Sequence, residues 1–498
     1  MFGWLRSKPA PRETTPWDPQ TPLIRWDSSG NDVLTLGDSY ENVLITGRTG
    51  SGKSSTSGKM IALAQLEAGF GGLVLTVKPG EAAMWREQCR QTGRLEDLRV
   101  VDFTANHRFN FLQELQSMQG DDAGLTENIV SLLMEVGQIG SRQTSASAGQ
   151  GDNAFFQQAC RTLLRNCIDL LILAEGEVSV SNLCRLVSAL PKSMDQVRSE
   201  DWRKSSPCYR LLTKADQRAF TPRQQRDYEA VLDYVMCDFP SLADRTRSSI
   251  TATFMAFADL FQRGLLHNLL STDTTLSPRE IEDGKIIVID LPLKVTGEVG
   301  LTAQLVWKLM AQRILERRAV TSRTRPAFIH IDEAQFFASG QSDALFATTC
   351  RSARVSLILL TQSISGFVTA FGGGDMGQAL TDQLLANLST KIIHATGDTG
   401  TAEWAAELCG RDYRMLCNMS NSAGGTTDWA AMAGIGGNGQ ATSGLTESLQ
   451  YEIEPREFAY LRTGGARNSF LADAILIRSG VPFTSTGRTW RPITLSQK

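Results

Sequence analysis

The sequence has little of what zinc-binding, secreted or membrane-spanning proteins need. It contains only four histidines, and none of its nine cysteines lies three residues from another, so the Cys-x-x-Cys spacing of zinc sites is missing. No window approaches the ~20 apolar residues of a membrane span. The formal net charge is only −3, which argues against a surface that binds nucleic acid all over. We therefore expect a cytoplasmic protein with reduced thiols and no membrane span of its own.

What is present is typical of a large globular enzyme. The chain has 498 residues, of which 42% are hydrophobic and 21% are charged. A chain of this length is longer than a domain with a single hydrophobic core usually is, so two or three domains are expected.

The most informative segment is a glycine-rich stretch that follows a short apolar strand. Val43–Thr46 is apolar and β-branched, and Gly52-Lys53-Ser54 follows Gly47 at the spacing of a Walker A phosphate loop. Glycines let the loop turn tightly and bring backbone N–H groups onto phosphate oxygens. Helix-forming residues continue to Gly69, and a helix N-terminus favours the same anion. We expect the nucleotide to be bound by Gly47, Arg48, Thr49, Gly50, Ser51, Gly52, Lys53, Ser54 and Ser55.

Two residues of this loop have distinct predicted roles. Lys53 can reach the β- and γ-phosphates, and the Ser54 hydroxyl can bind Mg²⁺. The predicted cofactors are therefore ATP and Mg²⁺. The alternative is a Gly/Ser turn that binds nothing, but the strand before the loop and the helix after it favour nucleotide binding.

A second apolar strand ends in two acids. Ala327–Ile331 runs into Asp332 and Glu333, the Walker B arrangement. At the end of such a strand Asp332 can hold Mg²⁺, while Glu333 can orient or deprotonate the attacking water. This pair turns a predicted nucleotide site into a predicted hydrolysis site.

A third apolar strand, Val355–Leu360, is flanked by polar groups that suit phosphate chemistry. It ends at Thr361-Gln362, and Gln362 is placed to sense the γ-phosphate. Arg351 and Arg354 precede the strand, and an arginine there can reach the nucleotide of a neighbouring subunit. A surface ion pair is the alternative for either arginine; we expect Arg351 to be catalytic.

Strands that alternate with helices predict an α/β fold with a mainly parallel sheet, interrupted by a helical insertion. Between about residues 126 and 270 the pattern is almost entirely helical, and strand character resumes at Lys285–Leu291. We expect a flexible proline-rich tail, a first nucleotide-binding part, an inserted all-α domain and a second nucleotide-binding part. Their bounds are residues 1–30, 31–120, 121–275 and 276–498. Residues 421–443, rich in Gly, Ser, Thr and Ala, read as a long loop.

The chain resembles the FtsK–HerA group of RecA-like P-loop ATPases, and within it the VirD4/TraG/TraD coupling proteins of type IV secretion. The phosphate loop and the acid pair fit this resemblance, and so does the helical insertion. Residues 77–81 (Val-Lys-Pro-Gly-Glu) resemble the family's Asp-Pro-Lys-Gly-Glu, and residues 108–112 its Phe-Asn-Pro-Leu. Thr361-Gln362-Ser363 resembles its strand-ending sensor, and Ile453–Leu461 its closing segment. The pair of transmembrane helices usual in the family is not present.

The resemblance implies a homo-oligomeric ring, usually a hexamer, that hydrolyses ATP and passes DNA through a central channel. It also implies relaxase or type IV secretion partners, and a cytoplasmic motor held peripherally at the inner membrane through one of them. The basic stretch from Arg203 to Arg226 is then a candidate substrate surface. Two alternatives stay open: a type IV secretion ATPase that moves protein substrates, and a HerA-like DNA-processing or defence ATPase.

Overall fold

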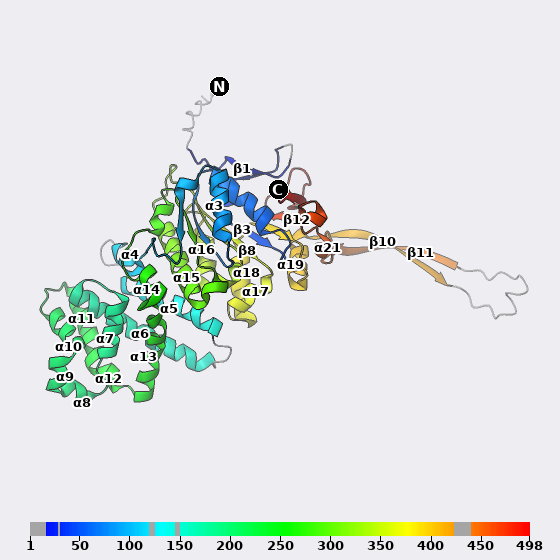
Figure 1. The fold of residues 1–498 in the computed structure, drawn as a ribbon. Coiled ribbons are helices and arrows are strands. Elements are labelled where there is room, and N and C mark those ends of the chain that lie inside the picture. The colour runs from blue at the N-terminus through cyan, green and yellow to red at the C-terminus, as the bar shows by residue number, and fades with distance from the viewer. Residues whose placement is uncertain (1–15, 28–29, 119–124, 145–149, 423–439) are drawn as a thin grey trace, which may run out of the picture.

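The structure is a computed structural model that describes residues 16–27, 30–118, 125–144, 150–422 and 440–498. Figure 1 shows an α/β body, a helical block at one end of it and a long hairpin that projects from the other.

The body is built on a nine-stranded sheet in the order β13-β12-β9-β3-β8-β7-β4-β6-β5. The seven strands from β9 to β5 are parallel, whereas β12 and β13 add an antiparallel edge. The strands are β3 (Val43–Thr46), β4 (Gly71–Leu75), β5 (Leu98–Val101), β6 (Ile286–Ile289), β7 (Ala327–Ile331), β8 (Val355–Thr361), β9 (Thr390–His394), β12 (Leu471–Arg478) and β13 (Trp490–Ser496). The predicted α/β class with a mainly parallel sheet is confirmed.

The central strands are apolar along their whole length because both faces of the sheet are covered. Every residue of β3, β7 and β8 is buried. On one face α2 (Lys59–Glu67) and α3 (Glu81–Gln91) pack on Ile45 and Phe328, and on the other α15 (Leu293–Arg317) packs on Leu44 and Ile329. Alternate strand residues therefore enter two separate cores.

Shorter helices complete the body. They are α1 (Leu36–Ser39), α4 (Phe111–Ser117), α16 (Gln341–Thr349), α17 (Ile364–Ala370), α18 (Gly374–Ala386), α19 (Thr399–Cys409) and α21 (Glu457–Tyr460). The single-turn segments are η1 (Ser54–Gly58), η2 (Leu95–Asp97), η5 (Pro278–Ile281), η6 (Ala334–Phe337) and η7 (Ala466–Asn468).

The described residues between β5 and β6 form helices, as the sequence predicts. The block beyond α4 contains α5 (Leu125–Thr144), α6 (Gln150–Glu175), α7 (Val180–Ala189), α8 (Met194–Arg198), α9 (Glu200–Ser205), α10 (Pro207–Asp216), α11 (Pro222–Asp233), η3 (Tyr234–Asp238), α12 (Phe239–Ser241), α13 (Asp244–Ala258), η4 (Asp259–Phe261) and α14 (Gly264–Leu270). We call these elements the helical block.

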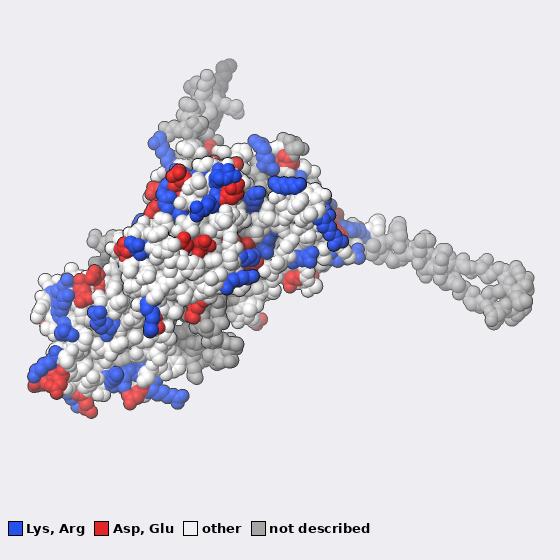
Figure 2. Space-filling view, viewed as in Figure 1, with Lys and Arg blue, Asp and Glu red and all other residues white. Residues whose placement is uncertain are grey.

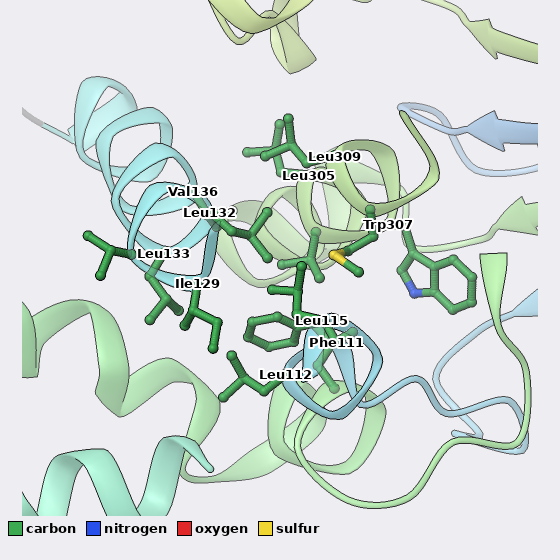
Figure 3. Close-up of a cluster of buried hydrophobic side chains, with 14 of the residues drawn as sticks. Phe111, Leu112, Leu115, Ile129, Leu132, Leu133, Val136, Leu305, Trp307 and Leu309 are labelled. Carbon is green, nitrogen blue, oxygen red and sulfur yellow. The ribbon is translucent and has the colours of Figure 1, made fainter. Parts of the chain in front are cut away.

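The helical block shares its hydrophobic core with the sheet. Figure 3 shows α4, α5 and α15 meeting through buried side chains, among them Ile129, Leu133, Phe111 and Leu305. The i, i+3, i+4 spacing on α5 presents one apolar stripe to α15. Because one core runs through both parts, α15 supports the sheet and the helical block together.

The expected loop at residues 421–443 is wrong at both of its ends. β10 (Arg411–Ser422) and β11 (Gln440–Tyr451) form an antiparallel hairpin, paired from Arg411 with Tyr451 to Ser422 with Gln440. Figure 1 shows this hairpin projecting from the body. Small and polar residues suggested a loop, but cross-strand backbone pairing does not require large side chains. The rest of the expected loop, residues 423–439, lies outside the described residues.

The expected flexible tail at residues 1–30 is also wrong where the structure describes it. β1 (Pro22–Arg25) pairs with β2 (Val33–Thr35), and Ile24 and Trp26 are buried. The Trp17 indole N–H donates to the Ala68 carbonyl at 3.0 Å. Apolar and aromatic residues between the prolines hold this segment on the body, whereas residues 1–15 lie outside the description.

Among the described residues, no helix is both long enough and apolar enough to cross a membrane.

Candidate active site

The phosphate loop lies between β3 and the helix that follows it. Gly52 has a φ of 96°, and a Cβ there would lie 2.9 Å from the Cβ of Ala472, so the turn requires glycine. Arg48, Thr49 and Gly50 are exposed at the rim, whereas Gly47 and Ser51–Lys53 are buried. The helix starts with a π turn, η1, before it becomes α2. π turns inside helices are common at functional sites.

The structure brings the acid pair to the phosphate loop. The Ser54 hydroxyl donates to Asp332 Oδ2 at 2.7 Å, and Lys53 Nζ lies 3.7 Å from Glu333 Oε1. These contacts arise because β3, β8 and β7 are parallel neighbours whose carboxyl ends share one edge of the sheet. The two oxygen ligands predicted for Mg²⁺, on Ser54 and Asp332, are therefore adjacent.

Gln362 joins the same cluster at the end of β8. Its amide donates to both carboxylate oxygens of Glu333, each at 3.1 Å. Gln335 donates to Glu333 Oε2 at 3.1 Å and accepts from the Thr361 hydroxyl at 3.0 Å. Glu333 itself has a φ of 52°, a conformation that non-glycine residues rarely adopt and that occurs at active sites.

Sequence reasoning missed the role of one residue in this cluster. Lys78 was noted only for the resemblance of residues 77–81, but its Nζ lies 3.1 Å from Glu333 Oε1 and 3.9 Å from Asp332 Oδ2. Lys78 follows β4, which pairs with β7, so both chains reach the same edge. The strand order that creates this contact is not readable from a local pattern.

The loop that carries Lys78 is fixed by the half-buried carboxylate of Glu81. Glu81 Oε2 accepts from the backbone N–H groups of Val77 and Lys78, at 2.8 and 3.3 Å. Burial and the nearby charge of Asp332 raise the pKa of Glu81 to about 7, although these N–H groups oppose the shift.

The charges of the cluster stabilise an ionised Glu333. Burial by itself would raise the pKa of Glu333, but hydrogen bonds from Gln335, Gln362 and Lys78 and the charge of Lys53 together lower it. Burial would lower the pKa of Lys78, but the two Walker B acids and Glu81 raise it. Both shifts favour the ionised carboxylate of Glu333 and the protonated ammonium of Lys78 at neutral pH.

The two arginines before β8 lie at the opposite edge of the sheet. Arg351 is 71% exposed and pairs with Glu41 at 3.0 Å, in the segment before β3. Arg354 has a φ of 54° and donates to the backbone carbonyls of Ser322 and Thr324, each at 3.2 Å. Arg354 is thus engaged in holding a turn, whereas Arg351 extends to the surface and cannot reach the phosphate loop of its own chain.

The predicted nucleotide ligands fit a phosphate and a divalent cation. The loop presents a tight glycine turn, Lys53 supplies a positive charge, and Ser54 and Asp332 offer adjacent hard oxygens. Ser54, Glu81 and Asp332 also line a small cavity between α2 and α3, with Trp85 and His330 at its apolar side.

Comparisons with known proteins concern the fold and one part of the chain. The family model described as "TraM recognition site of TraD and TraG" matches residues 326–452, which include Asp332, Glu333, Arg351 and Gln362. No curated protein sequence matches the chain.

Solved structures of the conjugative coupling protein TrwB share the fold. An unbound form has a TM-score of 0.56 at 14% identity, covering 92% of this chain and 86% of that one. A form in complex with ADP and Mg²⁺ has a TM-score of 0.55 at 14% identity, covering 94% and 87%. A form with a non-hydrolysable GTP analogue has a TM-score of 0.54 at 15% identity, covering 92% and 86%.

The fold and the site together define a RecA-like P-loop NTPase. The family match and the shared fold support the predicted resemblance to the VirD4/TraG/TraD type of coupling ATPase.

A buried histidine at the end of β9 packs against the phosphate loop. His394 Nε2 lies 2.8 Å from the Ser57 hydroxyl, and its Cβ is 2.7 Å from the position that a Cβ on Gly47 would take. Burial lowers the pKa of His394 from the ordinary 6.5 to about 4, so the ring is neutral at pH 7.

The buried state of His394 predicts a loss of stability in acid. Between its folded and unfolded pKa values the unfolded chain binds the proton first, so stability falls as the pH falls through this range. From pH 7 to pH 5 His394 should contribute a loss of about 2 kcal/mol in the free energy of unfolding. His394→Gln keeps a hydrogen-bond partner for Ser57 but does not titrate. Its free energy of unfolding should therefore fall by about 2 kcal/mol less than that of the wild type over the same pH range. Urea unfolding at both pH values measures the difference, and equal losses in both proteins would contradict it.

Proposed function

We propose that this chain is an ATP-hydrolysing ring motor that translocates DNA, of the conjugative coupling-protein type. The observation that carries the proposal is the convergence of Lys53, Ser54, Asp332, Glu333 and Gln362 at one edge of the parallel sheet. These groups supply every role that phosphoryl transfer to water requires within one subunit.

Each group has a defined task in hydrolysis. Lys53 and the loop N–H groups bind the β- and γ-phosphates. Ser54 and Asp332 would hold Mg²⁺, which neutralises phosphate charge. Glu333, ionised at neutral pH, orients the attacking water and accepts its proton, and Gln362 is placed to relay the presence of the γ-phosphate to Glu333.

The position of Arg351 supports a ring, and the family resemblance implies that this ring is a hexamer. Arg351 is exposed at the sheet edge opposite the phosphate loop, so its guanidinium is available to the nucleotide of a neighbouring subunit. An arginine supplied in this way offsets the charge that develops on the transferred phosphoryl group.

DNA is the proposed substrate, held in a central channel mainly through its phosphates. The basic stretch from Arg203 to Arg226 in α9–α11 is a candidate contact surface. Figure 2 shows Lys and Arg interspersed with Asp and Glu over the helical block, so any attraction there is local. Relaxase or type IV secretion components are the proposed partners, and one of them would hold the motor at the inner membrane from the cytoplasmic side.

The first test is ATP hydrolysis with and without DNA. We expect DNA to stimulate hydrolysis. Glu333→Gln should lower the rate by about 100-fold or more while nucleotide binding persists, because only the base is removed. Lys53→Ala should lose both binding and hydrolysis. If neither single- nor double-stranded DNA binds the protein or stimulates it, the motor for DNA is excluded.

The second test concerns sharing of the site between subunits. Arg351→Ala should bind ATP but hydrolyse it about 1,000-fold more slowly. Mixing Arg351→Ala with Lys53→Ala should restore activity, because some interfaces then pair an intact phosphate loop with an intact arginine. Arg354→Ala is the matched control: it should lower thermal stability, and mixing it with Lys53→Ala should restore no more than its own activity. Failure of the Arg351 mixture would argue against a shared site.

A second candidate, a motor that takes up protein substrates, is favoured by the hairpin. The β10–β11 hairpin lies within the region matched by the TraM-recognition family model. Tyr413, Met415 and Leu449 expose large apolar side chains on it. Tyr413 and Leu449 are cross-strand partners, so their side chains share one face of the hairpin.

A triple variant tests whether the exposed apolar face of the hairpin binds a protein. Replacing Tyr413, Met415 and Leu449 by Ser should weaken binding to a TraM-type relaxosome protein by about 30-fold or more, as loss of an aromatic interface centre does. Calorimetric titration measures the affinity, and basal ATP hydrolysis should not change. Tyr460→Ser, which removes an exposed tyrosine outside the matched region, should bind normally. Equal binding by all variants would remove the hairpin from partner recognition.

A further inference from the structure

Three donor nitrogens surround the carboxylate of Glu333. Lys78 and Gln362 donate to Oε1, and Gln335 and Gln362 donate to Oε2, all at 3.1 Å. An ionised carboxylate offers about four lone-pair positions. These three nitrogens occupy most of that capacity, because Gln362 Nε2 is shared between the two oxygens. Lys53 adds its charge at 3.7 Å. In this conformation Glu333 is therefore restrained, and little of its carboxylate is open to an attacking water.

Lys78 is the charged donor that is able to leave. Its side chain is 40% exposed, whereas that of Lys53 is 6% exposed. Gln335 is tied to the Thr361 hydroxyl. Gln362 is itself exposed, but it contacts both oxygens of Glu333 and its short side chain starts directly after the buried strand β8. A lysine ammonium on its four-carbon stem can change partners without movement of the backbone.

The backbone beneath Lys78 is held still. Glu81 fixes the N–H groups of Val77 and Lys78, and Gly80 closes the turn with a φ of 91°. The base of the side chain is thus positioned while its charged end reaches the Walker B acids. This arrangement suits a group that must move by a few ångströms between two anions.

We propose that Lys78 is a second lysine of the nucleotide site. It restrains Glu333 when no triphosphate is bound, and it moves to a terminal phosphate oxygen when ATP binds. This exchange frees one position on Glu333 for the attacking water and adds a positive charge where the phosphoryl group is transferred. Lys78 stays protonated throughout, so no covalent bond changes. The inference rests on the proposed ATPase function.

The test compares a triphosphate with a diphosphate. Lys78→Met should lower kcat by about 100-fold and weaken binding of a non-hydrolysable ATP analogue by about tenfold. Binding of ADP should not change, because ADP lacks the phosphate that Lys78 contacts. Lys78→Arg should restore part of the rate. Calorimetric titrations and steady-state hydrolysis measure these quantities.

Lys285→Met is the matched control. Lys285 is also partly buried and ion-paired, at 2.9 Å from Asp97, but it precedes β6 at the opposite edge of the sheet. It should hydrolyse ATP at the wild-type rate, and melting curves check that both variants fold.

Three outcomes would overturn the inference. The first is unchanged hydrolysis in Lys78→Met, and the second is equal weakening of ADP and the analogue, which would indicate support of the loop alone. The third is faster hydrolysis, which would indicate a lysine that only restrains Glu333. A wild-type protein that hydrolyses no ATP would instead refute the proposed function, so the two failures are distinguishable.

Discussion

Parallel pairing of β3, β8 and β7 is the constraint on which the site depends. Thr46 lies opposite Thr361, and Ile331 lies opposite Leu359, so the three strands end within two residues of one another. The loops that leave these ends must meet. Burial of both sheet faces makes the register costly to change, since a slip by one residue would exchange the side chains of two cores. The contacts among Lys53, Asp332 and Glu333 follow from this register.

The same strand arrangement separates the positive charge of Arg351 from the phosphate loop of its own chain. Arg351 lies before β8 and Gln362 directly after it, and the seven residues of β8 span roughly 20 Å. No side chain of one subunit bridges that distance. The Arg351 guanidinium and a phosphate loop could therefore act on one nucleotide only across a contact between two copies of the chain, which is the contact that the proposed ring would provide.

The strands that are buried on both faces could be predicted from the sequence, because each of them is a continuous run of apolar residues. This applies to β3, β7 and β8. The site residues at the ends of these strands could also be predicted, because phosphate binding, Mg²⁺ binding and orientation of water each require particular residue types. Lys78 was not readable as a site residue, because its contact depends on the pairing of β4 with β7, which no local pattern encodes. The hairpin strands were missed because they contain many small and polar residues. At the hairpin base, where burial is described, residues 411–415 are exposed and residues 447–451 are exposed or half-buried.

The helical block and the Walker B segment share α15 as a common support. Lys308 of α15 is fully buried and binds Asp343 at 2.8 Å and the Phe337 carbonyl at 2.6 Å, in the segment that follows Glu333. Further along α15, Arg313 donates to the Asn128 carbonyl of α5 at 2.9 Å. Breaking a buried ion pair typically costs about 3–5 kcal/mol, so α15 is rigidly tied to that segment. A movement of α5 against the sheet would therefore act on α15, the same helix that holds the segment following Glu333.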